Sequence, residues 1–192
     1  CSHPHNNANR DFMHTVERQA EQLQMAGIKD VDVLGPMDAL DAPVDQFALP
    51  SDIALLVPGG AAHRPEKRWP VEKFSELARQ LYFDGVNPVL LGGPSETKIL
   101  NQISADCPQA RNLCGQTSLL QIAALARRAQ MSVGNDTGPM HLVAATGCQS
   151  VVLYSHASDP ALCGQRGPNV TYMRKPQLDD ITVEKVKEAS FA

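Results

Sequence analysis

The chain has 192 residues, of which 43% are hydrophobic and 20% charged, and its formal net charge is −4 at pH 7. This length fits one large domain, or one domain with part of another, and the hydrophobic content suffices for a packed core. A negative net charge gives no support to a nucleic-acid partner. The longest apolar runs, residues 53–57 and 151–154, are too short for a transmembrane segment.

Cysteine usage indicates a reducing compartment. The five cysteines are odd in number and show no C-x-x-C spacing, which favours free thiols in a cytoplasmic protein and argues against a zinc site. The first five residues, Cys1-Ser-His-Pro-His5, contain possible metal ligands, but a frayed tail is the favoured interpretation. No signal peptide is evident, and a first residue other than Met is compatible with a truncated N-terminus.

A helix and an irregular segment precede the main pattern. From Phe12 onward apolar residues recur at helical spacing, and Gly27 ends the predicted helix. Residues 30–52 carry many Asp and Pro residues with little periodicity, which is typical of a connector. We therefore expect an N-terminal helix and interdomain connector over residues 1–46 and a separate domain over residues 47–192.

From residue 53 onward, segments typical of strands alternate with helical ones. The predicted strands cover residues 53–57, 88–91, 111–113, 131–134 and 150–154, and the predicted helices cover residues 71–83, 94–105, 118–128, 139–146 and 183–189. Ser118 and Gln121 form a capping-box pattern at the start of one of these helices. Because strands alternate with short helices, we expect a Rossmann-like α/β fold, with a parallel sheet covered by helices on both faces.

In such a sheet, ligands bind beyond the carboxyl ends of the strands, so the loops that follow the strands are the candidate site. Three of these loops contain glycines near their start, at Gly59, Gly92 and Gly115, where the backbone can approach a ligand closely. None of them has the G-x-G-x-x-G order of a dinucleotide site or the lysine of a P-loop. We therefore expect neither a dehydrogenase nor a P-loop enzyme.

The fourth loop, Asn135-Asp-Thr-Gly138, joins a predicted strand to a helix that opens at Pro139. Free backbone N–H groups and the helix dipole at such a junction can hold a phosphate. The turn residues alone favour a simpler interpretation, in which Asp136 or Thr137 only caps the helix. From the residues alone, both interpretations stay open.

Five motifs follow one another along these loops: Pro58-Gly59, Lys67-Arg-Trp-Pro70, Gly92-Gly-Pro-Ser-Glu96, Gly115-Gln-Thr-Ser-Leu119 and Asp136-Thr-Gly-Pro-Met-His141. In this order they resemble the C-terminal domain of the glycosyltransferase family that contains the lipopolysaccharide heptosyltransferases. The resemblance implies the C-terminal half of a GT-B glycosyltransferase, which binds a nucleotide-sugar donor, usually ADP-heptose. It also implies inverting transfer of heptose to the lipopolysaccharide inner core, with no metal or other cofactor.

For the diphosphate, the resemblance implies a site made of one cation and several backbone groups. Lys67 would place its ammonium against the diphosphate, and the backbone N–H groups of Thr137 and Gly138 would donate to it. The turn at Gly59 and Gly60 would complete this site. Without the resemblance, Lys67 is best interpreted as a solvated lysine in a charged run.

The remaining donor contacts are also implied by the resemblance. Glu96 would accept hydrogen bonds from the ribose, and Thr117 and Ser118 would border the adenine. Asp136 has the wrong charge for a phosphate, so we expect it to order the turn or bind sugar hydroxyls, and His141 would lie near the donor. The simpler alternatives are an exposed first-turn glutamate at Glu96, a plain N-cap at Ser118 and a buried structural histidine at His141.

Some features depart from the family pattern. Ala61-Ala-His-Arg64 stands where relatives often carry hydroxyl residues, so the phosphate contacts there are expected to differ. Trp69 is expected to anchor its loop by packing. Only eleven residues precede Phe12, so we expect the acceptor-binding domain, with its carboxylate base, to be missing and the chain to be inactive alone.

Partners and alternatives follow from this division. We expect the lipopolysaccharide core to be bound through the missing domain, by a cytoplasmic enzyme that could be peripheral at the inner membrane. Two alternatives remain: the donor domain of another GT-B enzyme that uses a UDP-sugar, and a non-catalytic module that binds a nucleotide sugar.

Overall fold

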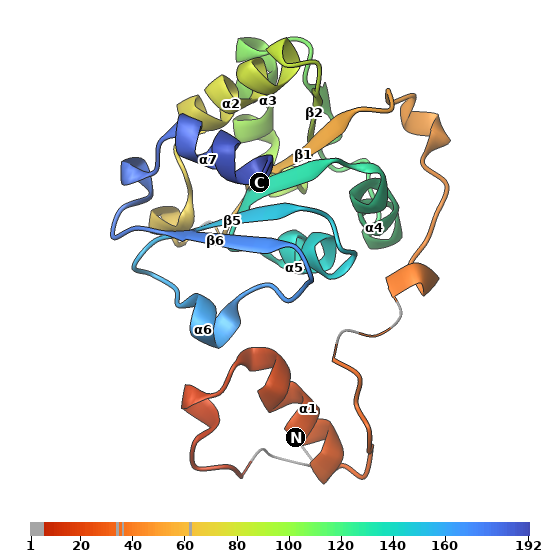
Figure 1. Cartoon of the computed structure of the whole chain (residues 1–192), viewed down its shortest axis with the longest axis vertical. Helices are drawn as coiled ribbons and strands as arrows, with labels where there is room; N and C mark the ends of the chain where they lie inside the picture. Colours follow the sequence, from red (N-terminus) through yellow and green to blue (C-terminus); the bar gives the residue numbers. More distant parts are fainter. Residues whose placement is uncertain (1–5, 34, 36, 62) are drawn as a thin grey trace.

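The computed structural model describes residues 6–33, 35, 37–61 and 63–192 (Figure 1). Residues 1–5, interpreted above as a frayed tail or metal ligands, lie outside the described residues. The strands are β1 (Ile53–Val57), β2 (Asn87–Leu90), β3 (Arg111–Asn112), β4 (Met131–Asn135), β5 (Ser150–Tyr154) and β6 (Val170–Arg174). The α-helices are α1 (Thr15–Met25), α2 (Val71–Phe83), α3 (Thr97–Asp106), α4 (Leu119–Arg128), α5 (Gly138–Ala145), α6 (Pro160–Cys163) and α7 (Val183–Ser190).

The strands form one parallel sheet in the order β3-β2-β1-β4-β5-β6. The chain runs outward from β1 through β2 to β3 and then returns to the other side of β1 to continue through β4, β5 and β6. The direction of travel therefore reverses between β1 and β4. In open α/β sheets, a ligand site forms outside the carboxyl ends of the strands at such a junction.

Two apolar cores cover the two faces of the sheet. On one face, Ala54 and Leu56 of β1 pack with buried residues of α2, α3 and α7. On the other face, Leu55 and Val57 pack with α4 and α5. Because both faces are covered, β1 is a continuous apolar run without polar alternation. The α/β sheet with helices on both faces, predicted from the sequence, is confirmed.

Helix ends agree with the predicted signals at several points. The Ser118 hydroxyl accepts from the Gln121 N–H, and the Gln121 side chain accepts from the Ser118 N–H, which completes the capping box. Gly27 follows α1 with a φ of +89°, a backbone conformation that glycine adopts without strain. The start of α1 was predicted wrongly, because Met13 is extended and leaves Phe12 in a 3₁₀ turn, 83% exposed.

Neither β6 (Val170–Arg174) nor α6 (Pro160–Cys163) was predicted from the sequence, and the predicted start of α3 was too early. β6 is a half-exposed edge strand, so it lacks the apolar run that marked the central strands. α6 has four residues, too few for a helical period. The segment predicted as one helix from residue 94 begins as a 3₁₀ turn, Pro94–Glu96, before α3. That turn places the Glu96 side chain at the end of β2.

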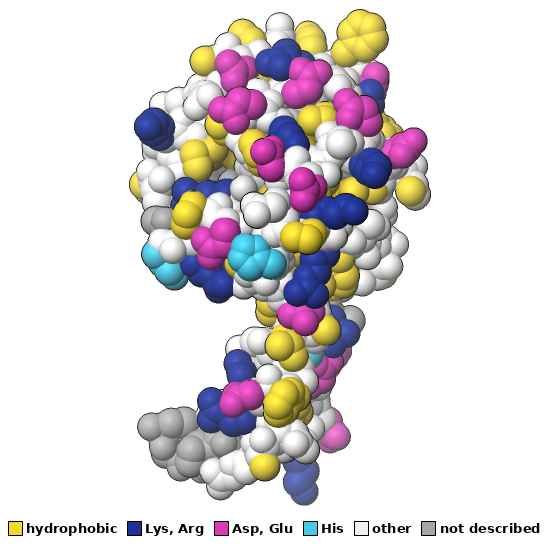
Figure 2. All heavy atoms as spheres, turned by 90° about the vertical axis from the view of Figure 1, so that its left-hand side faces the viewer, with side chains coloured by type: hydrophobic (Ala, Val, Ile, Leu, Met, Phe, Trp, Pro, Cys, Tyr) yellow, Lys and Arg dark blue, Asp and Glu magenta, His cyan; other side chains and the backbone are white. Residues whose placement is uncertain are grey.

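The N-terminal segment around α1 contacts the rest of the chain through polar groups at His14 and Glu17. His14 Nε2 lies 2.9 Å from the Gly164 carbonyl, and Glu17 pairs with Arg166. Figure 2 shows this segment projecting from the domain with hydrophobic side chains on its surface. Leu23 of α1 is one of the exposed large hydrophobic residues. Of the helices in the described ranges, none combines the length and apolar character needed to cross a bilayer.

Candidate functional site

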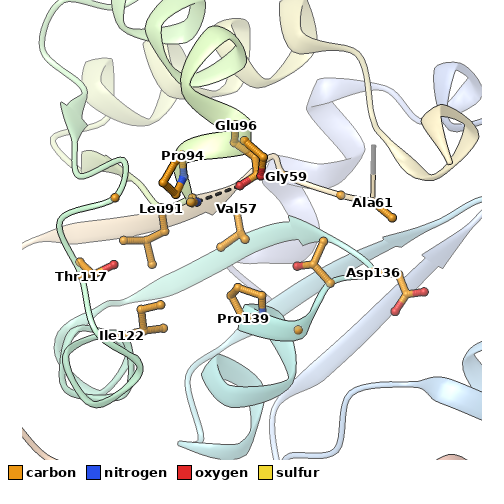
Figure 3. Close-up of a pocket in the computed structure, with 17 residues that line it drawn as sticks. Val57, Gly59, Ala61, Leu91, Pro94, Glu96, Thr117, Ile122, Asp136 and Pro139 are labelled. Carbon is orange, nitrogen blue, oxygen red and sulfur yellow. Dashed lines mark hydrogen bonds between the residues drawn. The ribbon is translucent and has the colours of Figure 1, made fainter. Parts of the chain in front are cut away.

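A cavity of about 660 Å³ opens at the carboxyl ends of β1, β2, β3 and β4, lined by the loops that follow these strands (Figure 3). Its apolar wall contains Val57, Leu91 and Ile122, and Thr117 lies beside them. Glu96 and Asp136 bring two carboxylates to its border, and Figure 3 shows Glu96 above Val57 and Asp136 to the right of it. The cavity thus combines an apolar part with polar ends, as in many small-molecule sites.

Most of the predicted site residues line this cavity. They are Gly59, Gly60, Glu96, Thr117, Asp136, Thr137 and Gly138. Lys67 is joined to the lining through Asp136, since its Nζ lies 2.6 Å from Asp136 Oδ2. Ser118 and His141 lie outside the lining. Ser118 is exposed and serves as the cap of α4, whereas His141 is half-buried in the first turn of α5.

The ion pair between Lys67 and Asp136 is largely withdrawn from water. The Lys67 side chain is 14% exposed and that of Asp136 is 8% exposed. The interpretation of Lys67 as a solvated lysine in a charged run is therefore wrong. The pair fixes the lysine ammonium at the edge of the cavity, where it lies beside the turn between β4 and α5.

Asp136 is held by several groups at once. Its Oδ1 accepts from Gln165 Nε2 at 3.2 Å, and the Tyr154 hydroxyl lies 3.3 Å away. Burial is the largest influence and raises the pKa of the Asp136 carboxyl. The hydrogen bond and charge of Lys67, together with the hydrogen bond from Gln165, outweigh it and leave the pKa below its ordinary value. The carboxylate is therefore ionised at neutral pH and orders the turn.

Simple capping does not account for this turn. Thr137 occupies the N-cap position of α5, but its side chain makes no capping hydrogen bond. The Thr137 hydroxyl is buried and has no partner among the described residues. The side-chain partners of Asp136 come from other elements rather than from the first turn of α5. The turn thus presents an unused hydroxyl next to a helix N-terminus, a combination that suits an anion.

Glu96 is fixed by its own loop. Oε2 accepts from the Gly93 N–H at 2.8 Å, and Oε1 accepts from the Ser95 hydroxyl at 2.7 Å. The side chain also packs on Gly59, where an added Cβ would lie only 2.9 Å from Glu96 Cγ. Glu96 is therefore half-buried at the cavity border, rather than an exposed first-turn glutamate, and a glycine at position 59 makes room for it.

The charge of Asp136 also acts on the pKa of His141. Burial lowers the pKa of its imidazole, the charge of Asp136 acts in the opposite direction, and His14 again lowers it. The net pKa lies below the ordinary value, so the ring is neutral at pH 7. A neutral imidazole can accept or donate a hydrogen bond, but it adds no positive charge to this region.

Two residues hold the loops in place. Trp69 is buried, donates from Nε1 to the Ile181 carbonyl at 3.0 Å and meets Phe74 edge-on, which confirms its role as a packing anchor. Asn135, which the sequence analysis did not single out, is fully buried at the end of β4 and bonds to Pro58, Gly59 and Trp69. The signal for Asn135 in the sequence was an amide side chain at the end of an apolar strand.

Comparisons with known proteins agree with this geometry. Glycosyltransferase family 9 (heptosyltransferase) matches residues 6–190. The lipopolysaccharide heptosyltransferase 2 of Escherichia coli K12 is 38% identical over 120 residues, which cover 59% of this chain and 34% of that protein. The lipopolysaccharide heptosyltransferase 1 of an E. coli O18:K1:H7 strain is 30% identical over 131 residues, which cover 67% of this chain and 40% of that protein.

Solved structures also match. E. coli ADP-heptose lps heptosyltransferase II superimposes with a TM-score of 0.70 and 29% identity, over 84% of this chain and 51% of that one. The E. coli heptosyltransferase WaaC with ADP matches with a TM-score of 0.72 and 26% identity, over 92% of this chain and 55% of that one. This chain thus spans about half the length of these solved heptosyltransferases. By its sequence and its fold, the chain belongs to glycosyltransferase family 9.

Proposed function

We propose that the cavity binds the nucleotide-sugar donor, ADP-heptose, for inverting transfer of heptose to the lipopolysaccharide inner core. The observation that carries the proposal is the position of Lys67 at one border of the cavity, where Asp136 fixes it. Asp136 directly precedes Thr137, whose hydroxyl has no partner among the described residues. This arrangement suits a diphosphate. A related solved structure, the heptosyltransferase WaaC, is described with ADP.

In this proposal the donor lies across the cavity. The adenine packs on the apolar wall formed by Leu91 and Ile122, next to Thr117. The ribose hydroxyls donate to Glu96, whose carboxylate is already oriented by Gly93 and Ser95. The proposed role of Lys67 is to balance the charge that develops on the departing diphosphate. Charge and preoriented dipoles of this kind stabilise such a leaving group.

Calorimetric titration of the 192-residue chain tests the proposed donor. We expect ADP to bind about tenfold or more tightly than AMP, because only ADP places a β-phosphate within reach of Lys67, and a charge-assisted hydrogen bond contributes roughly 1.5–3 kcal/mol. UDP should bind more weakly than ADP. Equal affinity for ADP and AMP would contradict the diphosphate assignment, and a preference for UDP would favour a transferase that uses a UDP-sugar.

A second expectation concerns turnover. Both cavity carboxylates are engaged, Asp136 by Lys67 and Glu96 by the Gly93 N–H, so neither is free to deprotonate an acceptor hydroxyl. We therefore propose that the 192-residue chain binds ADP-heptose without transferring it. Transfer should appear once the half of a family 9 enzyme that this chain does not match is supplied. Release of ADP by the chain alone, dependent on a lipid A–Kdo acceptor, would refute this division, and binding without release in either setting would indicate a non-catalytic module.

A further inference from the structure

We infer that Asn135 is a positioning residue of the donor site and that, together with Arg68, it turns the backbone N–H groups of residues 59–61 toward the diphosphate. The inference rests on the proposed function, because it concerns the same cavity. It adds two residues to which the sequence motifs assigned no role, and neither of them lines the cavity.

Asn135 connects three segments from a fully buried position. Its Nδ2 group donates to the Pro58 carbonyl at 2.8 Å and to the Gly59 carbonyl at 3.1 Å. Its Oδ1 accepts from the Trp69 N–H at 3.0 Å. One amide at the end of β4 therefore fixes both the loop that follows β1 and the segment that carries Lys67.

Arg68 holds the next carbonyl of the same loop. Its guanidinium donates to the Gly60 carbonyl, and its stem packs on the face of Gly60, where an added Cβ would lie 3.1 Å from Arg68 Cγ. The Nε–H of this guanidinium is buried without a partner among the described residues. Three consecutive carbonyls, those of Pro58, Gly59 and Gly60, are thus held by side-chain donors.

Fixing these carbonyls also fixes the N–H groups behind them. The described peptide bonds are trans, so the carbonyl of one residue and the N–H of the next point in opposite directions. The N–H groups of Gly59, Gly60 and Ala61 are therefore turned away from the side chains that hold the carbonyls. In the described part of the chain they donate no hydrogen bond, and all three residues line the cavity.

Consecutive backbone N–H groups that are free of protein partners can bind an anion where the chain turns. Here the site is formed before the ligand arrives, so binding does not have to order the loop. The segment Ala61-Ala-His-Arg64 contains no hydroxyl side chain that could donate to a phosphate, and backbone donors held by Asn135 and Arg68 serve instead.

The test compares ADP with adenosine, which shares the base and ribose but lacks the phosphates. Asn135→Asp keeps the size of the side chain and the acceptor for Trp69. It replaces the Nδ2 donor with a carboxylate oxygen that repels the carbonyls of Pro58 and Gly59, so these carbonyls lose the hydrogen bonds that orient them. We expect ADP affinity to fall about tenfold to a hundredfold, and adenosine affinity to stay within about threefold. Arg68→Met, which keeps the stem on Gly60, should change the same ratio in the same direction.

Ser132→Ala is the matched control. Ser132 lies in β4, the strand that ends at Asn135, and the substitution breaks a buried 2.9 Å hydrogen bond to Ser150 of β5 without touching the loops. We expect it to lower the melting temperature and leave the ratio of ADP to adenosine affinity unchanged. As a second readout, the amide ¹⁵N and ¹H shifts of residues 59–61 should move on addition of ADP but not of adenosine.

The outcomes separate the inference from the proposed function. If the wild-type chain does not bind ADP, the proposed function fails. If the wild-type chain binds ADP, but Asn135→Asp lowers ADP and adenosine affinity in equal proportion, the role of Asn135 is structural and the inference fails. If Asn135→Asp does not fold, Arg68→Met and the amide shifts decide, and unchanged ADP affinity with unmoved shifts overturns the inference.

Discussion

Lys67→Met should lower both ADP affinity and stability, and adding Asp136→Asn should restore the stability alone. The single variant leaves the Asp136 carboxylate, 8% exposed, without its cation, and removal of one partner from such a pair costs about 3 kcal/mol. The double variant contains no unpaired charge, so it should recover most of the free energy of unfolding. ADP affinity should remain about tenfold or more below that of the wild type, because the charge-assisted contact is lost.

The pH dependence of stability provides a further check. In the wild type the pKa of Asp136 is below its ordinary value, so its contribution to stability is complete above about pH 4 and is lost as the pH falls below that value. In Lys67→Met, burial acts on the carboxyl without the opposing cation, so its pKa rises and the deficit is greatest at neutral pH. The unfolding free energies of the two proteins should therefore converge in acid.

Lys187→Met is the control for charge. Lys187 of α7 pairs with Asp84, which follows α2, and neither residue lines the cavity, so its replacement removes one positive charge without touching the site. ADP affinity should stay within about twofold of wild type, since exposed pairs contribute little. Recovery of both stability and ADP affinity in the Lys67→Met and Asp136→Asn double variant would show that Lys67 acts only through folding.

Gly167→Ala should destabilise the protein more than alanine at any other glycine of the described residues. An added Cβ at Gly167 would lie 2.1 Å from the Ala144 carbonyl oxygen and 2.7 Å from its carbonyl carbon. Because the obstacle is the backbone of α5, no side-chain rotation can relieve it. We expect a loss of about 3 kcal/mol, which corresponds to a fall in the melting temperature of roughly 6–12 °C.

Gly138→Ala is the matched comparison for stability. It lies at the start of α5, and an added Cβ would have no neighbour within 4 Å. Alanine in a helix is also favoured over glycine by roughly 0.5–1 kcal/mol, so the melting temperature should stay unchanged or rise. Melting temperatures are measured by differential scanning calorimetry. Equal values for the two variants would show that the loop before β6 shifts to accommodate the added methyl group without loss of stability.

Strands such as β1 and β5 were predictable because burial on both faces leaves an apolar run, which is complete in β1 and follows Ser150 in β5. The edge strand β6 was not, since its half-exposed side chains mix polar and apolar residues without a clear run. Phe12 shows the limit of periodicity. It continues the helical spacing, yet the His14 imidazole accepts from the Val16 N–H and starts α1 after it.

At the candidate site, the sequence motifs predicted which residues belong to the site but not which of them interact with each other. Lys67 and Asp136 were both predicted, yet nothing in the sequence indicated that they form an ion pair, since they lie far apart in the chain and only the pairing of β1 with β4 brings them together. Asn135 was missed for a related reason. Its partners are backbone carbonyls and an N–H, which leave no trace in the identity of the residues that carry them.

The order of the sheet has a consequence for how the domain assembles. β1 and β4 are neighbours, although β2, β3 and three helices lie between them in the chain. Bringing the ends of so long a segment together lowers the entropy of the chain before any contact forms. The pairing of β1 with β4 is therefore entropically unfavourable early in folding. Since one wall of the cavity belongs to each half of the sheet, the nucleotide proposed for it would contact both halves. We therefore expect ADP to stabilise the complete sheet by mass action, and its protection against amide hydrogen exchange to extend to strands that it does not touch.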